Sequence, residues 1–396
     1  MVLSKKAKQI SASLTLDITA KTKKMKAEGI DVIGFGAGEP DFDTPKNIRE
    51  AAIKAISNGK TRYTPTSGII ELKEAIIQKF RKENNLTYIT SQIIVSAGAK
   101  QCLANIFQAI LNPGDEVLIG VPYWVSYPEL VKLADGIPVY IETKEINKFK
   151  LTIDSLNMAV TSKSKAIVLN SPNNPTGTVY SKEELMEIAD FAKNKNLIII
   201  SDEIYEKLLY GTKTHISIAS LSEDAYKRTI VINGLSKAYA MTGWRIGYAA
   251  GCTEIVSLMS NIQSHTTSNP NSIAQYASVE ALNGDQSATC KMIEQFKLRR
   301  DYMVEKINSI NGLSCIKPEG AFYVMMNISN ILNKSIDGKI IKNSFDFSNF
   351  LIEKEKVAVI PGIAFGTDNF VRLSYATSME NIKNGLNRIQ RFVENI

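Results

Sequence analysis

The chain of 396 residues is 44% hydrophobic and 22% charged, an ordinary globular composition that supports two domains with separate cores and excludes a disordered or low-complexity protein. Its net charge of +7 comes largely from residues 1–26, where seven lysines face the single acid Asp17, so no basic surface for a nucleic acid is expected. Four scattered cysteines and two histidines disfavour a disulfide framework or a metal site, and neither a membrane span nor a signal peptide is recognisable, which makes the cytoplasm the expected compartment.

The predicted elements begin with a segment that has too little apolar sequence to fold alone. We therefore expect residues 1–45 to pack on a small C-terminal domain, residues 290–396, with a large domain formed by residues 46–289. From about residue 92 the large domain alternates short apolar strands with amphipathic helices, a pattern typical of an α/β fold with a mainly parallel sheet. Strands are predicted in the segments QIIVSA, DEVLIG, IPVYIE, KAIVLN, NLIIIS and TIVIN.

Helix starts and the C-terminal unit are also readable. In SKEELMEIADFAKNKN, Ser181 is followed three residues later by Glu184, a capping box that predicts the start of a helix. Beyond Cys290 a charged helix, KMIEQFKLRRDYMVEKI, precedes the segments GAFYVMMNI, VAVIPGIAFG and FVRLSYA. These segments predict a second, smaller α/β unit.

Polar residues follow the ends of several predicted strands, where the ligand site of an open α/β sheet gathers. After QIIVSA come Gly98, Ala99 and Lys100, which open a helix whose first N–H groups can hold a phosphate. A glycine before a helix is commonplace, so this turn carries little weight alone. After KAIVLN comes SPNNPTG, where Asn174 precedes a proline, and turn chemistry by itself could account for that asparagine.

Two charged residues stand where apolar strands end. Asp202 follows NLIIIS, and a buried carboxylate there needs a cationic partner. Lys237 follows TIVIN. A desolvated lysine has a lowered pKa and forms Schiff bases with carbonyl compounds. The alternative is a lysine that starts a surface helix and extends its charged end into water. Together with Arg245, these strand ends would suit a cofactor with a phosphate, a pyridine nitrogen and an aldehyde.

Six motifs occur in order between about residues 31 and 380: GAGEPDFDTP, PYWVSYPELV, NSPNNPTG, SDEIYE, SKAYAMTGWRIGY and VRLSYATS. They resemble the motifs of the class I and II aminotransferases of pyridoxal-phosphate fold type I, and of the bacterial aspartate aminotransferase subgroup 1-beta in particular. The resemblance implies an α/β fold of that type and pyridoxal 5'-phosphate as the cofactor. It also implies amino-group transfer between L-aspartate and 2-oxoglutarate, which gives oxaloacetate and L-glutamate.

The resemblance assigns a role to each residue around the cofactor ring. Lys237 is implied to form the Schiff base and then to move the proton at the substrate's α-carbon. Asp202 would pair with the protonated pyridine nitrogen and keep the ring electron-poor. Tyr205 and Asn174 would hydrogen-bond the phenolic oxygen, and Trp124 would stack on the ring, although an aromatic residue after a strand is more often part of a core.

The phosphate is implied to lie between Arg245 and the Gly98–Lys100 turn. Tyr63, in TRYTPTSG, reaches in from the neighbouring subunit in this family, so the resemblance implies a homodimer with shared sites. The family often has a serine three residues before the Schiff-base lysine as a further phosphate ligand. Here Gly234 stands in that place, so the hydroxyl must come from Ser236 or is missing.

For the substrate, the resemblance assigns the α-carboxylate to Arg372, whose planar guanidinium suits a bidentate pair, with the backbone of Gly38 assisting. Trp124 and Asn174 are expected to contact the substrate as well. In the subgroup a lysine at the phosphate turn meets the distal carboxylate of the substrate, and here that residue is Lys100. The alternative for Lys100 is a solvated residue in the first turn of a helix.

Other activities on the same scaffold stay open. They are a glutamate or aspartate–prephenate aminotransferase, an aromatic or alanine aminotransferase, and a lyase or decarboxylase. Lys100 favours dicarboxylates among these, and Ser11 stands where prephenate-using members tend to carry a lysine, which disfavours prephenate. A transcription regulator built on the fold would need a DNA-binding domain, and only about 30 residues precede the matching region.

Overall fold

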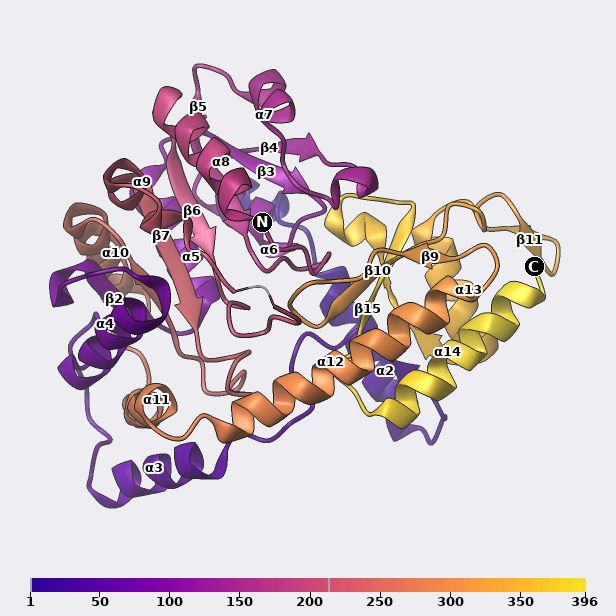
Figure 1. Cartoon of the computed structure of the whole chain (residues 1–396), viewed down its shortest axis with the longest axis horizontal. Coiled ribbons are helices and arrows are strands. Elements are labelled where there is room, and N and C mark those ends of the chain that lie inside the picture. The colour runs from indigo at the N-terminus through magenta and orange to yellow at the C-terminus, as the bar shows by residue number, and fades with distance from the viewer. Residues whose placement is uncertain (1, 213) are drawn as a thin grey trace.

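A seven-stranded sheet lies at the centre of one half of the molecule (Figure 1). The computed structural model describes residues 2–212 and 214–396. The strand order is β2-β8-β7-β6-β5-β3-β4; β8 is antiparallel to both of its neighbours, and the other strands are parallel to one another. The strands are β2 (Ile93–Ser96), β3 (Glu116–Val121), β4 (Ile137–Glu142), β5 (Ser164–Asn170), β6 (Ile198–Asp202), β7 (Thr229–Gly234) and β8 (Gly247–Ala250).

Alternate residues of the central strands point to opposite faces of the sheet, as the period of two requires. Ile230 and Ile232 of β7 pack in a core with α5, α6 and α10, whereas Val231 packs in a core with α4 and α11. A sheet buried on both faces explains why its strands read as continuous apolar runs. The helices around it are α3 (Lys46–Ser57), α4 (Ile70–Asn84), α5 (Ala99–Ile110), α6 (Ser126–Leu133), α7 (Ile153–Ala159), α8 (Lys182–Asn194), α9 (Glu223–Arg228), α10 (Thr253–Thr266) and α11 (Ser272–Asn283).

All six predicted strands of the large unit occur, and the predicted α/β class with a mainly parallel sheet is confirmed. The strand β8 is absent from the predicted set because GYAA is short and carries two alanines. It follows β7 without an intervening helix, so it must return antiparallel. The predicted capping box is also confirmed: Ser181 Oγ accepts from Glu184 N–H, and the Glu184 carboxylate accepts from Ser181 N–H.

A four-stranded antiparallel sheet, β14-β15-β10-β9, forms the core of the other half (Figure 1). The N-terminal segment reaches this half, because Ile33 of β1 pairs in parallel with Val357 of β13. The 22-residue helix α12 runs between the two halves. The elements here are α1 (Lys5–Lys8), α2 (Leu14–Ala27), β1 (Ile33–Gly34), α12 (Ser287–Asn308), β9 (Ser314–Cys315), β10 (Tyr323–Asn327), β11 (Ser335–Ile336), β12 (Lys339–Ile340), α13 (Ser344–Glu355), β13 (Val357–Ala358), β14 (Ile360–Pro361), β15 (Phe370–Ser374) and α14 (Met379–Glu394).

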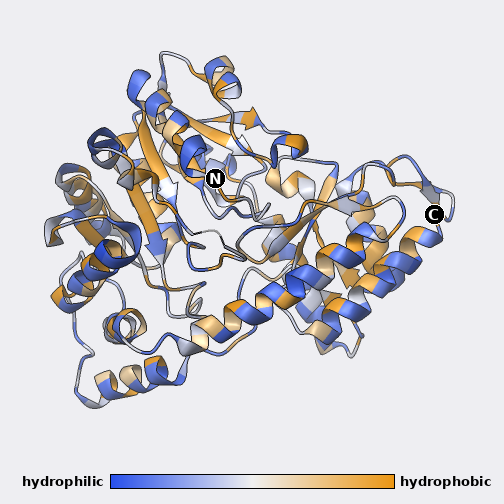
Figure 2. Ribbon diagram, viewed as in Figure 1, coloured by the Kyte–Doolittle hydropathy of each residue, from blue (hydrophilic) through white to orange (hydrophobic). Residues whose placement is uncertain are grey.

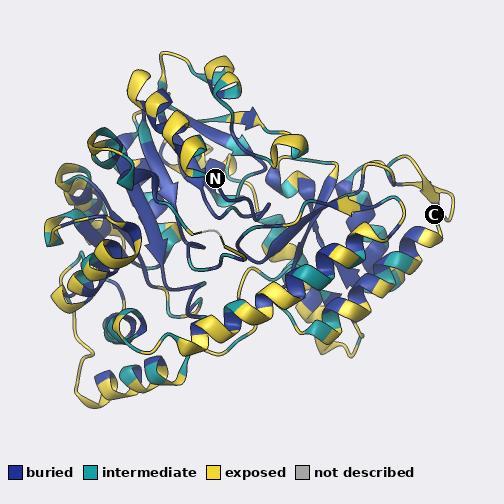
Figure 3. Ribbon diagram, in the orientation of Figure 1, coloured by how far each residue is buried: buried dark blue, intermediate teal, exposed yellow. Residues whose placement is uncertain are grey.

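Hydropathy and burial follow the same layers in both halves. The strands of the two sheets are apolar and buried, whereas the surrounding helices are two-faced, with polar, exposed residues turned outward (Figures 2 and 3). Along the described residues, no helix combines the length and the apolarity that crossing a membrane requires. The division into three segments that we expect from the sequence stays a prediction.

Candidate active site

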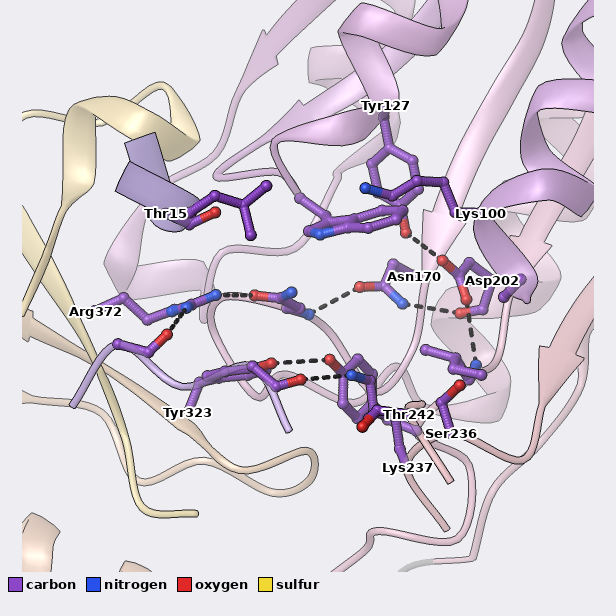
Figure 4. Close-up of a pocket in the computed structure, with 18 of the residues that line it drawn as sticks. Thr15, Lys100, Tyr127, Asn170, Asp202, Ser236, Lys237, Thr242, Tyr323 and Arg372 are labelled. Carbon is purple, nitrogen blue, oxygen red and sulfur yellow. Dashed lines mark hydrogen bonds between the residues drawn. The ribbon is translucent and has the colours of Figure 1, made fainter. Parts of the chain in front are cut away.

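A cavity of about 300 Å³ lies where the carboxyl ends of β5, β6 and β7 face the four-stranded sheet (Figure 4). All but two of the site residues predicted from the sequence line it, and the exceptions are Gly98 and Tyr63. The carboxyl ends of parallel strands share one edge of a sheet, which explains why residues so far apart in the chain meet. The predicted residues that line the cavity are Gly38, Ala99, Lys100, Trp124, Asn174, Asp202, Tyr205, Ser236, Lys237, Arg245 and Arg372.

Asp202, the last residue of β6, is 3% exposed. Tyr127 of α6 donates a 2.7 Å hydrogen bond to Asp202 Oδ2, and the N–H of Ile204 donates to Oδ1 at 3.2 Å. Burial raises the pKa of Asp202 to about 6, and these two hydrogen bonds oppose the rise because they stabilise the carboxylate. The cavity therefore contains a carboxylate that a bound cation would stabilise further.

Lys237 lies just beyond β7, and its Nζ donates to the carbonyl oxygen of Gly38 at 2.5 Å. Burial, helped by Arg245 and Arg372 and opposed by Glu39 and Asp202, lowers the pKa of Lys237 to about 8. About a tenth of this amine is therefore neutral at pH 7, far more than of an exposed lysine, and the neutral form is a nucleophile and a proton acceptor.

Arg245 faces the start of α5. The guanidinium donates to the carbonyl oxygens of Thr242 and Ala97, and Gly98, the N-cap of α5, has φ +87°. A Cβ at residue 98 would collide with the Arg245 guanidinium. The glycine therefore allows the arginine to approach the N-terminus of α5. Gly98 thus shapes the turn without lining the cavity, whereas Ala99 of the same turn lines it. A helix N-terminus beside a guanidinium is suited to an anion.

Arg372 of β15 enters the cavity from the four-stranded sheet and is 3% exposed (Figure 4). It donates to Asn174 Oδ1 at 2.9 Å and to the carbonyl oxygen of Gly36 at 3.2 Å, and its guanidinium lies 4.3 Å from the centre of the Tyr323 ring. Its Nε has no hydrogen-bond partner among the residues that the structure describes. A buried guanidinium with an unused donor calls for an acceptor such as a carboxylate.

Lys100 and Trp124 lie on the opposite wall, with Lys100 Nζ 5.0 Å from the centre of the Trp124 ring. Burial lowers the pKa of Lys100, and the neighbouring Arg245 adds to the effect. Trp124 is partly buried and lines the cavity, which sets it apart from an ordinary core aromatic. The wall can thus offer an aromatic face and a cation to the same ligand.

Several residues that line the cavity are absent from the predicted set. Tyr127 holds Asp202, and Asn170, the last residue of β5, bonds the backbone of both Asp202 and Asn174. Tyr323 of β10 shares a 3.0 Å hydrogen bond between hydroxyls with Tyr205. The signal for Asn170 was its place at the end of a strand, one residue before the turn. The remaining residues that line the cavity and were not predicted are Thr15, Leu16, Thr19, Gly36, Ile204 and Thr242.

Tyr63 is not brought to this cavity within one chain. Its side chain is 91% exposed, and it lies in the connection between α3 and α4. A large aromatic side chain held out in this way has little to gain unless another surface covers it. Its predicted role in a neighbouring subunit's site stays a prediction.

Of the two departures from the family pattern, the one at Gly234 has a local explanation. A Cβ on Gly234 would lie 3.0 Å from Gly247 Cα and 3.1 Å from the carbonyl oxygen of Ile246, because β7 and β8 approach closely there. A serine would not fit without a shift of backbone, and Ser236 lines the cavity instead. Ser11 donates its N–H to a carboxylate oxygen of Glu129 in α6 at 3.0 Å, beside a second cavity that also touches Lys100.

A buried ion network lies beside β6 and outside the cavity. Glu203 accepts from His215 Nε2 at 2.8 Å, and Glu206 accepts from Lys79 and, at 2.9 Å, from Asn84. Burial disfavours the charged imidazole, but Glu203 reverses this and raises the pKa of His215. Burial also opposes the charge on Glu206, but Lys79, His215 and Asn84 together outweigh it and hold that pKa at about 2. The two carboxylates and the histidine lie close enough to ligate one cation, but Glu206 is already paired with Lys79, and Glu203 with His215.

The chain matches known proteins along nearly its whole length. It is 50% identical to the aspartate aminotransferase of Bacillus sp. (strain YM-2), covering 99% of both chains. It is 48% identical to the aspartate/prephenate aminotransferase of Nitrosomonas europaea, covering 98% of this chain and 99% of the relative. The structure superposes on the aspartate aminotransferase of Thermus thermophilus with maleate at a TM-score of 0.92, with 43% identity and 99% of each chain covered.

The family described as aminotransferase class I and II matches residues 30–389, which include every strand of both main sheets. The predicted resemblance is confirmed by that match and by the full-length relatives. Because the family match extends over nearly the whole chain and full-length relatives share about half of its residues, the chain belongs to the class I and II aminotransferases.

Proposed function

We propose that the protein is an aspartate aminotransferase, which transfers the amino group between L-aspartate and 2-oxoglutarate through pyridoxal 5'-phosphate. The observation that carries the proposal is the charge of the cavity. Four cationic side chains line it, namely Lys100, Lys237, Arg245 and Arg372, against the single buried carboxylate of Asp202. Such a set matches one phosphate and two substrate carboxylates, which are the anions that this reaction brings together.

The residues fit the cofactor on three independent grounds. Asp202 is buried, and the pKa of its carboxyl, raised to about 6, would fall beside a pyridinium. Lys237 offers an amine whose pKa is lowered to about 8. Arg245 lies against the N-terminus of α5 across Gly98, in the arrangement that favours a phosphate. When bound, pyridoxal phosphate supplies an aldehyde for bonding to amines and a ring that withdraws electrons from the substrate's α-carbon.

The chain's own residues supply positioning and proton transfer. Lys237 accepts the proton from the α-carbon as a neutral amine and returns it to the product, which its lowered pKa permits near neutral pH. Asp202, held by Tyr127, keeps the pyridine nitrogen protonated. Tyr205 and Asn174 would hydrogen-bond the phenolic oxygen; their polar atoms now bond to Tyr323 and Arg372 of the four-stranded sheet.

The substrate's two carboxylates are assigned to opposite walls. Arg372, with its unpartnered Nε, binds the α-carboxylate, and the backbone of Gly38, which lines the same cavity, assists. Lys100 binds the distal carboxylate beside Trp124. The Thermus thermophilus relative was solved with maleate, a dicarboxylate, which supports this division.

A homodimer completes the proposal. Tyr63 is 91% exposed in the single chain, and the proposal places its hydroxyl at the phosphate of a neighbouring subunit's site. The prediction of a cytoplasmic enzyme belongs to the same proposal.

A second candidate is an aspartate/prephenate aminotransferase, since the Nitrosomonas europaea relative carries that name. Ser11 argues against it, because the N-terminal segment then offers a hydroxyl where prephenate-using members tend to have a cation. An aromatic or alanine aminotransferase is disfavoured by Lys100, which such substrates leave without a partner.

A panel of amino acids, followed through the absorbance of the bound cofactor, tests the proposal. We expect aspartate and glutamate to convert the cofactor at least about tenfold more efficiently than alanine, phenylalanine or prephenate-derived arogenate. The Lys237→Ala variant is the control: it should still bind the cofactor but lose at least about 10⁴-fold in turnover. Equal efficiency across the panel would contradict the assignment of the substrate, and turnover without Lys237 would contradict the mechanism.

A further inference from the structure

Gln263 of α10 is fully buried and uses its whole hydrogen-bonding capacity. Its Nε2 donates to the carbonyl oxygen of Thr66 at 2.7 Å and to that of Val95 at 2.8 Å. Its Oε1 accepts from Ser96 Oγ at 2.5 Å and from Asn105 Nδ2 at 2.9 Å. A buried amide that satisfies four groups from three separate segments fixes the positions of those segments relative to one another.

One of these segments is the connection between α3 and α4. We call residues 61–69 the arm, because it carries Tyr63. A second buried glutamine, Gln275 of α11, clamps the arm at two places: its Nε2 donates to Thr64 Oγ1 at 3.0 Å, and its Oε1 accepts from the N–H of Ile69 at 2.8 Å. The arm is therefore held on both sides of Thr66, and Tyr63 extends from the held part.

The arm also lies directly against strand β2. The N–H of Val95 donates to the carbonyl oxygen of Ser67 at 3.0 Å. Gly68 has φ +103°, and a Cβ there would lie 2.7 Å from Val95 Cγ2. A glycine permits both the backbone conformation and the close approach, so the arm is built to follow β2.

The other two segments that Gln263 joins lead to the phosphate turn of the same chain. Ser96 is the last residue of β2, two residues before Gly98, and Asn105 lies in α5, the helix that the turn opens. Gln263 thus connects the arm to the chain's own phosphate turn through a single buried side chain.

We propose that Gln263 and Gln275 are positioning residues for two active sites at once. Both glutamines hold the arm whose Tyr63 serves the partner's phosphate, and Gln263 in addition holds the chain's own Gly98 turn. Removing the hydrogen bonds of Gln275 is expected to affect only the partner's site, which receives the arm. Removing those of Gln263 is expected to affect the partner's site and the chain's own site. The inference rests on the proposed function, because it requires a dimer in which Tyr63 crosses between subunits.

Hybrid dimers separate the two effects. One chain keeps Lys237, so that its site alone gives the absorbance of a lysine-bonded cofactor, and the other chain carries Lys237→Ala and lends its arm to that site. The dissociation constant is measured for pyridoxal phosphate and for pyridoxal, which lacks the phosphate. Positioning for the phosphate predicts a change with the first ligand alone, whereas general loss of structure would affect both.

With Gln275→Met or Thr64→Val in the arm-lending chain, we expect pyridoxal phosphate to bind about tenfold more weakly at the intact site, with pyridoxal unchanged. Thr64→Val removes only a partly exposed hydroxyl, so it keeps the test available if the buried substitution does not fold. Gln263→Met is expected to weaken phosphate binding from either chain. Ser278→Ala, a buried change in α11 whose hydroxyl bonds only within its own helix, is the matched control and should have no effect.

Tyr63→Phe in the arm-lending chain separates the positioning role of the two glutamines from the shared site on which it depends. If that variant weakens phosphate binding but Thr64→Val and Gln275→Met do not, the positioning role is overturned and the shared site stands. If Tyr63→Phe has no effect either, or if the chains do not form dimers in sedimentation, the shared site itself is wrong, and the inference falls with it.

Discussion

The hydroxyl of Tyr127, in helix α6, lies 2.7 Å from Oδ2 of Asp202 and donates a hydrogen bond to it. Both side chains are buried, so this hydrogen bond acts in surroundings of low dielectric, where bonds to a charged group are strong. It stabilises the ionised carboxylate, which burial alone would drive toward the neutral acid. Tyr127 therefore increases the charged fraction of Asp202 at a given pH, together with the N–H of Ile204.

Removing that hydroxyl with Tyr127→Phe should raise the pKa of Asp202 above its value of about 6, by roughly one unit for a bond to a charged group. Because an incoming cofactor meets the cofactor-free site, the acidic limb of the profile of pyridoxal-phosphate affinity against pH should move to higher pH by a similar amount. Tyr180→Phe, at a buried tyrosine that bonds the backbone of Leu151, is the control and should leave the limb in place. An unmoved limb in Tyr127→Phe would show that Asp202 does not set it.

Asp202→Ala should reduce turnover far more than it reduces stability. The folded-state pKa of Asp202 is raised from 3.8 to about 6, so the native state binds more protons than the unfolded state, and this carboxylate lowers stability as pH rises from about 4 to 6. Removing the carboxylate at pH 7 removes the free-energy cost of burying its charge, and this gain in stability offsets the loss of its hydrogen bonds. We expect kcat to fall at least about 10³-fold, with a melting temperature within a few degrees of the parent. A variant that fails to fold would assign the carboxylate a structural role.

Lys100→Ala should raise the barrier for aspartate and glutamate by about 2 to 4 kcal/mol, the scale for leaving one member of a desolvated charge pair alone. Phenylalanine should change much less, because Arg372 still binds its α-carboxylate. The measurement is kcat/KM at saturating cofactor. Lys132→Ala removes a cation that lies on the neighbouring cavity and pairs with Glu129, so it controls for a general change of charge. An equal loss for both substrates would assign Lys100 to the phosphate.

His215→Gln should destabilise the fold in a pH-dependent way. Glu203 raises the folded-state pKa of His215 above 6.5, so the stability from the charged imidazole is fully present below pH 6.5 and is lost as pH rises through the folded value. Glu206 and Lys79 also face the ring, with opposite effects. We expect a loss of about 1 to 3 kcal/mol at pH 6, shrinking in alkaline solution, as measured by denaturant unfolding. A loss independent of pH would indicate packing alone.

The sequence predicts the residues of the cavity that directly follow a strand. Asp202, Lys237 and Asn174 were predicted because a parallel sheet collects whatever follows its strands, and the cavity lies at that edge. The parallel direction of β3 to β7 then follows, because a helix lies between each of these strands and the next. Arg372 came instead from the resemblance, since its place opposite Asp202 depends on how the two sheets face each other.

The residues that the sequence did not disclose are those whose role depends on tertiary contacts. Tyr127 and Tyr323 are aromatic residues in apolar surroundings, and nothing in the local pattern separates them from core residues. Thr15 and Leu16 reach the cavity because β1 pairs with β13, a contact between residues more than 300 positions apart. The strand β8 was missed because its alanines and glycine carry little strand propensity, and its burial between β2 and β7 supplies what the propensity lacks.

Arg245 keeps its guanidinium beside the Gly98 turn at a conformational cost, because its backbone has φ +56°. A side chain in that left-handed region costs roughly 1 kcal/mol, which a glycine would not incur. An arginine at residue 245 thus serves the proposed phosphate site, although its backbone conformation favours glycine. A glycine at this position would relax the backbone but would lose the hydrogen bonds to Thr242 and Ala97 and leave the Gly98 turn without its cation.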